Sequence, residues 1–224
     1  MRTIDAYQNG GIIEADTASL LSRVLWITTA GFLFTALGAW LAPAALPGVS
    51  IMLVFLVNLG LIFAINATRR SPALSLTLFY AFTTLMGVEI GPLLGYYLHL
   101  PGGVTVVFNA ALTTALGMAT MAIIAQFARF NYRKVGAIAT MALLGLILVG
   151  VIAMFVHFLQ PGVYAWLTLA IFSVLILVDF MRLKDGGAGA TPVQLALSIY
   201  LDALNIFLAL LQIFGGRRRD DRWS

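Results

Sequence analysis

The chain has 224 residues, of which 61% are hydrophobic and only 10% charged, with a formal net charge of +4 and no cysteine. Because the exterior of a soluble domain must face water, this composition excludes an ordinary soluble domain. The lack of cysteine excludes disulfides, thiolate metal sites and a cysteine nucleophile. The positive charge does not indicate a nucleic-acid partner, since the basic residues cluster beside apolar runs, where they orient a membrane protein.

The first 23 residues are polar, with acidic side chains and no short apolar core ahead of a small-residue cleavage site, so we expect no removable signal peptide. We assign 1–23 to a cytoplasmic segment, 24–214 to a transmembrane domain in the lipid bilayer, and 215–224 to a basic C-terminal tail. The sequence thus predicts an all-α polytopic membrane protein. Runs long enough to cross a bilayer predict seven transmembrane helices, at 24–41, 49–67, 73–98, 104–127, 135–158, 163–181 and 193–214.

The loops between these runs alternate in charge. Those around Pro47, Gly102 and Gln160 carry none, whereas the others carry Arg69 and Arg70; Arg129, Arg133 and Lys134; and Arg182 and Lys184. Because basic loops remain in the cytoplasm, we expect a multi-pass plasma (inner) membrane protein with a cytoplasmic N-terminus. The arginine-rich tail then lies outside unless the last run is re-entrant, and we favour a full crossing.

The last run carries polar residues at helical spacing: Gln194, Ser198, Asp202, Asn205 and Gln212. About 100° per residue puts them in one stripe, which should face other helices or a wet cavity. For the amides, two interpretations are equally good: they hydrogen-bond across helices and join them (helix–helix glue), or they line a pathway. Asp202 favours the pathway, because an acid is a costlier way to join helices.

Two further acids lie in apolar runs. Asp179, in "ILVDFMRLK", is only about one helical turn shallower than Asp202, so the two carboxylates could meet. Alternatively, Arg182, three residues further on, satisfies Asp179 at the interface. Glu89, in "MGVEIGPLLG", precedes Pro92, which should loosen the helix. Glu89 either pairs with a freed backbone group or lines an outer vestibule.

The stretch "SIYLDALNIFLALLQIFG" resembles the last-span signature of the Bax-inhibitor-motif membrane proteins, L-Y-L-D-x-x-N-x-F. The likeness extends over about residues 21–214, including "LSRVLWITTAGFLFTALGA" and the Arg-Arg pair before the third run. It implies seven spans with the last at the centre of the bundle, and a pH-sensitive calcium leak. It also implies that Asp179 and Asp202 form the family's aspartate pair and that Arg69 or Arg70 is its basic latch.

Two positions depart from the family's pattern. Val178 stands where tyrosine often precedes the acid of the sixth span, and Asn58 where the second span often carries an acid. The first departure bears on how the pair is held, and the second on the type of an outer calcium site.

The chemistry of two close carboxylates suggests a gate. Like charges cannot cheaply share a dry site, so the pair tends to hold one proton. Protonated, Asp179 and Asp202 can hydrogen-bond and close the cytoplasmic mouth. Deprotonated, they repel each other, attract a cation and can recruit Arg69 or Arg70. We therefore predict a passive, proton-gated cation pathway, with calcium as the transported or bound ion at the two aspartates and no other cofactor.

Enzymatic alternatives fit the sequence poorly. Intramembrane aspartyl proteases carry Y-D and G-x-G-D motifs, whereas this chain has "VDF" and "IYLD". A Ser/His hydrolase is not favoured, because His99 and His157 lie at span ends, where interfacial side chains are common. We therefore expect no enzyme. The runner-up is a non-conducting regulator or partner of another membrane protein, such as a membrane protease.

Overall fold

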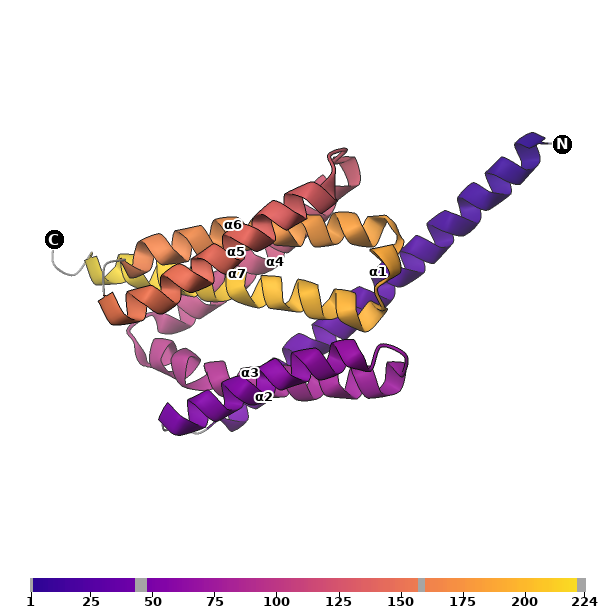
Figure 1. Ribbon diagram of the computed structural model, residues 1–224. Coiled ribbons are helices and arrows are strands. Elements are labelled where there is room, and N and C mark those ends of the chain that lie inside the picture. The colour runs from indigo at the N-terminus through magenta and orange to yellow at the C-terminus, as the bar shows by residue number, and fades with distance from the viewer. Residues whose placement is uncertain (1, 43–47, 157–159, 221–224) are drawn as a thin grey trace. The chain divides into compact units, whose positions relative to one another are not determined.

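The computed structural model describes the backbone of residues 2–42, 48–156 and 160–220, and the side chains of 17–42, 52–153, 156, 160 and 162–216. Within these residues the chain is helical and has no strand (Figure 1). This confirms the predicted all-α class. The seven long helices are α1 (Arg2–Leu41), α2 (Gly48–Ala67), α3 (Pro72–His99), α4 (Gly103–Phe127), α5 (Tyr132–Val156), α6 (Pro161–Lys184) and α7 (Pro192–Asp220).

Six of these helices, all except α2, are long and apolar enough to cross a membrane. The 20 residues of α2 rise about 30 Å, which also matches a bilayer core. The side chains of α2 are described only from Met52 onward. The number and order of the helices confirm the predicted polytopic membrane protein.

The largest difference from the predicted boundaries is at α1, which begins 22 residues before the predicted start of the first span. Its membrane-compatible part is Thr17–Leu41, and the polar residues before it continue the same helix. No proline occurs before Pro43, so nothing forces a break between the polar and apolar parts.

Short turns join the helices. Gly102, with a left-handed φ of 69°, begins α4, and the Oδ1 of Asn131 accepts the backbone N–H groups of Arg133 and Lys134 at the start of α5. A short 3-10 turn, Gly186–Gly189, joins α6 to α7. Parts of the predicted loops (43–47 and 157–159) and of the predicted termini (1 and 221–224) lie outside the described residues.

The chain forms two compact units, Met1–Gly91 with Arg182–Ser198, and Pro92–Met181 with Ile199–Ser224. In the first unit, α1 and α3 approach so closely that a Cβ on Gly38 would overlap the backbone of Thr84, and one on Gly87 the backbone of Thr35. The Thr35 hydroxyl donates to the carbonyl of Thr83 at 3.0 Å. Small residues therefore hold these helices together, as is common in membrane proteins.

In the second unit, α5 packs on α6, with Gly136 beside Val178 and Gly150 beside Tyr164. A Cβ on Gly136 would lie 3.0 Å from Cγ1 of Val178, so the glycine lets Val178 pack closely on α5. The most enclosed helix is α7, with 61% of its apolar window buried against 11–33% in the other five candidate spans. The predicted central place of the last helix in the bundle stays a prediction.

Candidate functional site

The structure brings Asp179 of α6 and Asp202 of α7 together in the second unit. Their side chains are only 7% and 6% exposed, and the two carboxyl groups lie close enough to interact directly with each other. A hydrogen bond between two carboxyl groups requires a proton on one of them, whose O–H then donates to the other. The arrangement therefore allows the two carboxyl groups to share a proton.

The helix segments that carry the pair are apolar and buried. Phe180 and Met181 beside Asp179, and Ala203 and Leu204 beside Asp202, are all buried. Within the described residues, the Oδ2 atom of Asp202 is buried without a hydrogen-bond partner. Leaving a polar atom unsatisfied in such a place costs free energy, so an ionised Asp202 would be strongly disfavoured unless a cation or water joined it.

Arg182, the alternative partner of Asp179, makes one hydrogen bond beyond the end of α6. Its Nε donates to the carbonyl of Gly187, at 3.3 Å, in the connection between α6 and α7. Because arginine has further N–H donors, the interpretation of Asp179 as an interfacial acid satisfied by Arg182 stays open.

The polar stripe on α7 is more accessible than Asp202. Gln194, Ser198 and Asn205 are half-buried and Gln212 is exposed, whereas Asp202 lies at the buried edge of this face. The Nδ2 of Asn205 donates to the carbonyl of Leu201 in its own helix at 2.8 Å. No contact yet distinguishes pathway lining from helix–helix glue for Ser198, Asn205 and Gln212, so both interpretations stay open.

Gln194 has a structural role that the sequence analysis missed. Its Oε1 accepts the backbone N–H of Thr191 at 3.0 Å, and its own N–H donates to the Thr191 hydroxyl at 3.3 Å. This is a capping box, and the T-x-x-Q spacing could have revealed it. The Nε2 of Gln194 also donates to Oδ1 of Asn66 on α2 at 2.9 Å. These bonds hold Gln194 at the start of α7, and its place in a pathway stays a prediction.

Glu89 is paired with a side chain rather than with a backbone group freed by Pro92. The Nδ2 of Asn58 on α2 donates to its Oε2 at 2.8 Å and also lies 3.3 Å from the Sδ of Met86. Asn58 is buried and Glu89 half-buried. The residue that stands in place of the family's acid in the second span is therefore the partner of Glu89.

Arg69 and Arg70 are exposed at the turn between α2 and α3. They belong to the first unit and the acid pair to the second, so their role as a latch stays a prediction. His99 bonds to the carbonyl of Gly95 in its own helix, and His157 lies outside the described residues. Among the described side chains, no third histidine, cysteine or acid joins the pair, so the predicted calcium contact rests on the two aspartates.

Comparisons with known proteins agree with the last-span signature. The family described as Bax1-I, inhibitor of apoptosis-promoting Bax1, matches residues 17–219. An uncharacterized protein of Campylobacter jejuni is 26% identical over 207 residues, or 89% of each chain. A Neisseria meningitidis protein is 31% identical over 166 residues, or 74% of this chain and 72% of that one. An uncharacterized membrane protein of Vibrio cholerae is 24% identical over 92% of this chain and 93% of its own. The chain belongs to the Bax inhibitor family of membrane proteins.

Proposed function

We propose that this Bax inhibitor-family protein is a passive, pH-gated cation leak of the bacterial inner membrane, with a cytoplasmic N-terminus and calcium as its ion. The observation that carries the proposal is the burial of the Asp179 and Asp202 carboxyl groups beside each other. Intramembrane acids are costly and commonly mark ion or proton pathways. The protein would move an ion without catalysing a reaction.

The physical basis of the gate is the difference between one and two negative charges. With a proton shared, the pair holds α6 and α7 together through the hydrogen bond. When that proton leaves, two carboxylates face each other in apolar surroundings, and their repulsion is relieved by separation or by a cation. Opening should therefore increase as the pair deprotonates, which means that flux rises with pH.

The test is calcium flux into liposomes containing the purified protein, measured across a pH series. Asp202→Asn keeps a hydrogen bond to Asp179 but removes one charge, so we expect flux to lose most of its pH dependence. Asp179→Asn should behave in the same way. The double variant should add little, because groups that act as a pair are not additive.

Glu89→Gln is the matched control, because it neutralises a different intramembrane acid, which is paired with Asn58 rather than with an aspartate. It should keep the pH dependence of the parent protein. All variants must match the parent in thermal stability in detergent. If both aspartate variants fold normally and conduct with the parent's pH profile, the pair only joins helices, and a non-conducting partner of another membrane protein becomes the better assignment.

A further inference from the structure

A cavity of about 480 Å³ lies in the first unit, and neither aspartate of the acid pair lines it. Its walls come from three separate segments: α1, the turn from α2 into α3, and the first turn of α7. Ile27, Leu76 and Val193 make the interior apolar, with Pro72 beside them. This volume is within the range of ligand sites, about 300–1,000 Å³, and an apolar wall suits a hydrocarbon chain.

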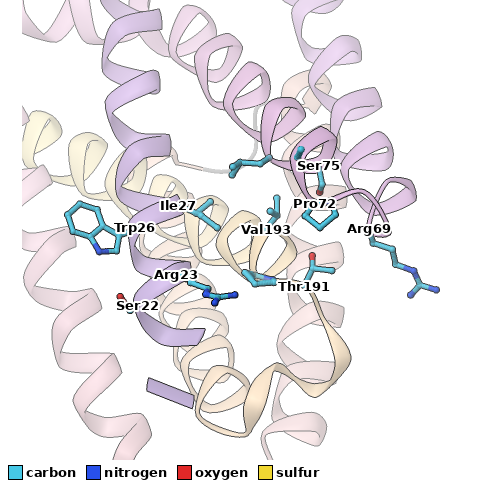
Figure 2. A pocket seen from close by; sticks show the side chains of 12 residues that line it. Ser22, Arg23, Trp26, Ile27, Arg69, Pro72, Ser75, Thr191 and Val193 are labelled. Atoms are coloured by element: carbon cyan, nitrogen blue, oxygen red, sulfur yellow. The ribbon is translucent and has the colours of Figure 1, made fainter. Parts of the chain in front are cut away.

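Two arginines border this cavity, Arg23 on α1 and Arg69 in the turn between α2 and α3. In Figure 2, Arg23 extends toward Thr191, while the guanidinium group of Arg69 extends outward on the other side of Thr191 and Val193. Both arginines are exposed, and within the described side chains neither makes a hydrogen bond or ion pair. The N-terminus of α7 adds partial positive charge, so the rim is suited to an anion.

The rim carries residue types that concentrate at the headgroup level of a bilayer. Trp26, one helical turn from Arg23, is 74% exposed, and tryptophan concentrates at the membrane–water interface. Arg23, Arg69 and the start of α7 lie at the helix ends that the charge pattern assigns to the cytoplasm. The apolar wall begins directly beside them, where lipid acyl chains begin.

We propose that this cavity binds one anionic phospholipid from the cytoplasmic leaflet, with its phosphate between Arg23 and Arg69 and part of an acyl chain inside. A free anion would leave the apolar wall of the cavity unfilled. A zwitterionic lipid would place its own positive charge beside the two guanidinium groups of the rim, which would repel it. Guanidinium groups match phosphate oxygens in geometry as well as in charge. The site is independent of the proposed gate, and it gives Arg69 a partner other than the aspartates.

The test is native mass spectrometry of the full chain in detergent, titrated with phosphatidylglycerol or phosphatidylcholine of identical acyl chains. We expect one phosphatidylglycerol to bind more tightly than phosphatidylcholine. Each of Arg23→Gln and Arg69→Gln should weaken phosphatidylglycerol binding about fivefold, and the pair together should remove the preference. Ala73→Leu, which fills the cavity from α3, should weaken both lipids while leaving the preference intact.

Arg70→Gln is the matched control, because Arg70 is exposed beside Arg69 but does not line the cavity. It should bind phosphatidylglycerol as the parent does. If Arg70→Gln and Arg69→Gln weakened phosphatidylglycerol binding equally, the proposal would be overturned, because the lipid would then respond only to the general positive charge of the surface. Displacement of the lipid by millimolar inorganic phosphate would also overturn it, because the site would then bind a free anion. Equal binding of the two lipids by the parent protein would do the same.

Discussion

At the scale of single residues, the connection between α6 and α7 depends on glycines in a left-handed conformation. Gly186, Gly187 and Gly189 have φ values of 75°, 80° and 79°, a region that other residues seldom adopt. Ala188 also has a positive φ, of 48°. This turn directly precedes the capping box of α7 at Thr191 and Gln194. The geometry of the turn therefore determines where α7 begins.

Two alanine substitutions separate backbone strain from crowding in this turn. A Cβ on Gly186 would have no atom within 4 Å, whereas one on Gly187 would lie 3.0 Å from Cδ1 of Leu195. We expect Gly186→Ala to lower the free energy of unfolding by about 1 kcal/mol and Gly187→Ala by about 2 kcal/mol. Denaturant unfolding in detergent measures both. Gly95→Ala, in open space on α3, should be neutral or slightly stabilising, and equal losses at positions 186 and 187 would contradict a contribution from Leu195.

The Asn58–Glu89 hydrogen bond should be measurable as a coupling between α2 and α3. Asn58→Leu removes the donor and leaves the Glu89 carboxyl group without it, so we expect a loss of about 1–3 kcal/mol in the free energy of unfolding. The double variant Asn58→Leu, Glu89→Leu should lose less free energy of unfolding than the sum of the losses in the two single variants. We expect the difference to be about 0.5–3 kcal/mol.

The control for this cycle is Thr77→Ala on α3. The Thr77 hydroxyl is exposed and donates only to Ala73 of its own helix. Its removal should change stability by no more than about 0.5 kcal/mol. Additive losses at Asn58 and Glu89 would show that their contact contributes nothing.

At the scale of the helices, α1 and α3 meet where their side chains are smallest. Gly31, Thr35 and Gly38 lie on α1, opposite Thr83, Thr84 and Gly87 of α3. A Cβ on Gly31 would lie 2.9–3.2 Å from the Phe79 and Thr83 side chains. Because lipid is as apolar as the helix surfaces, this close packing and the Thr35–Thr83 bond, rather than a hydrophobic effect, stabilise the pair.

Alanine at Gly38 or Gly87 should force α1 and α3 apart. A Cβ at either position would overlap a backbone carbonyl oxygen, which cannot move as the end of a flexible side chain can. We expect each change to lower the free energy of unfolding by at least about 2 kcal/mol. Gly60→Ala and Gly117→Ala add the same methyl group with no atom within 4 Å, so they should leave stability unchanged or raised. Similar losses at all four positions would exclude helix separation as the cause.

At the scale of the whole molecule, the charge pattern predicts which loops face the cytoplasm. Single cysteines can be introduced without background, because the chain has none. We expect Gln160→Cys to react with an impermeant maleimide only from outside intact cells, and Lys134→Cys only after the cytoplasm is opened. Reaction of Gln160→Cys from the cytoplasmic side alone would reverse the topology.

The side of the membrane on which the C-terminus lies needs a separate test. A full crossing by the last helix would place the arginine-rich tail outside, whereas the basic loops are predicted to be cytoplasmic. The α7 helix runs without a break over 29 residues, about 43 Å, which favours a full crossing over a re-entrant segment. Ser224→Cys should then be labelled from outside. Labelling from the cytoplasm would mean that the tail returns and that the last span is incomplete.

The sequence by itself determined the class of the protein, the order of its helices and the residues of the acid pair. In a bilayer each backbone group must be satisfied within its own helix, so apolar length and the positions of proline and glycine are enough to locate the spans. Asp179 and Asp202 were predictable as neighbours because a short connection joins the two helices that carry them.

Only the tertiary structure decided which faces meet. Asn58 donates a hydrogen bond to Glu89, 31 positions away, and Gln194 donates one to Asn66, 128 positions away. No spacing in the sequence predicts either pairing. The cavity between Arg23, Arg69 and Val193 likewise joins three distant segments. Contacts of this kind depend on the shapes of side chains packed from separate helices, and many alternative pairings differ by only small free energies.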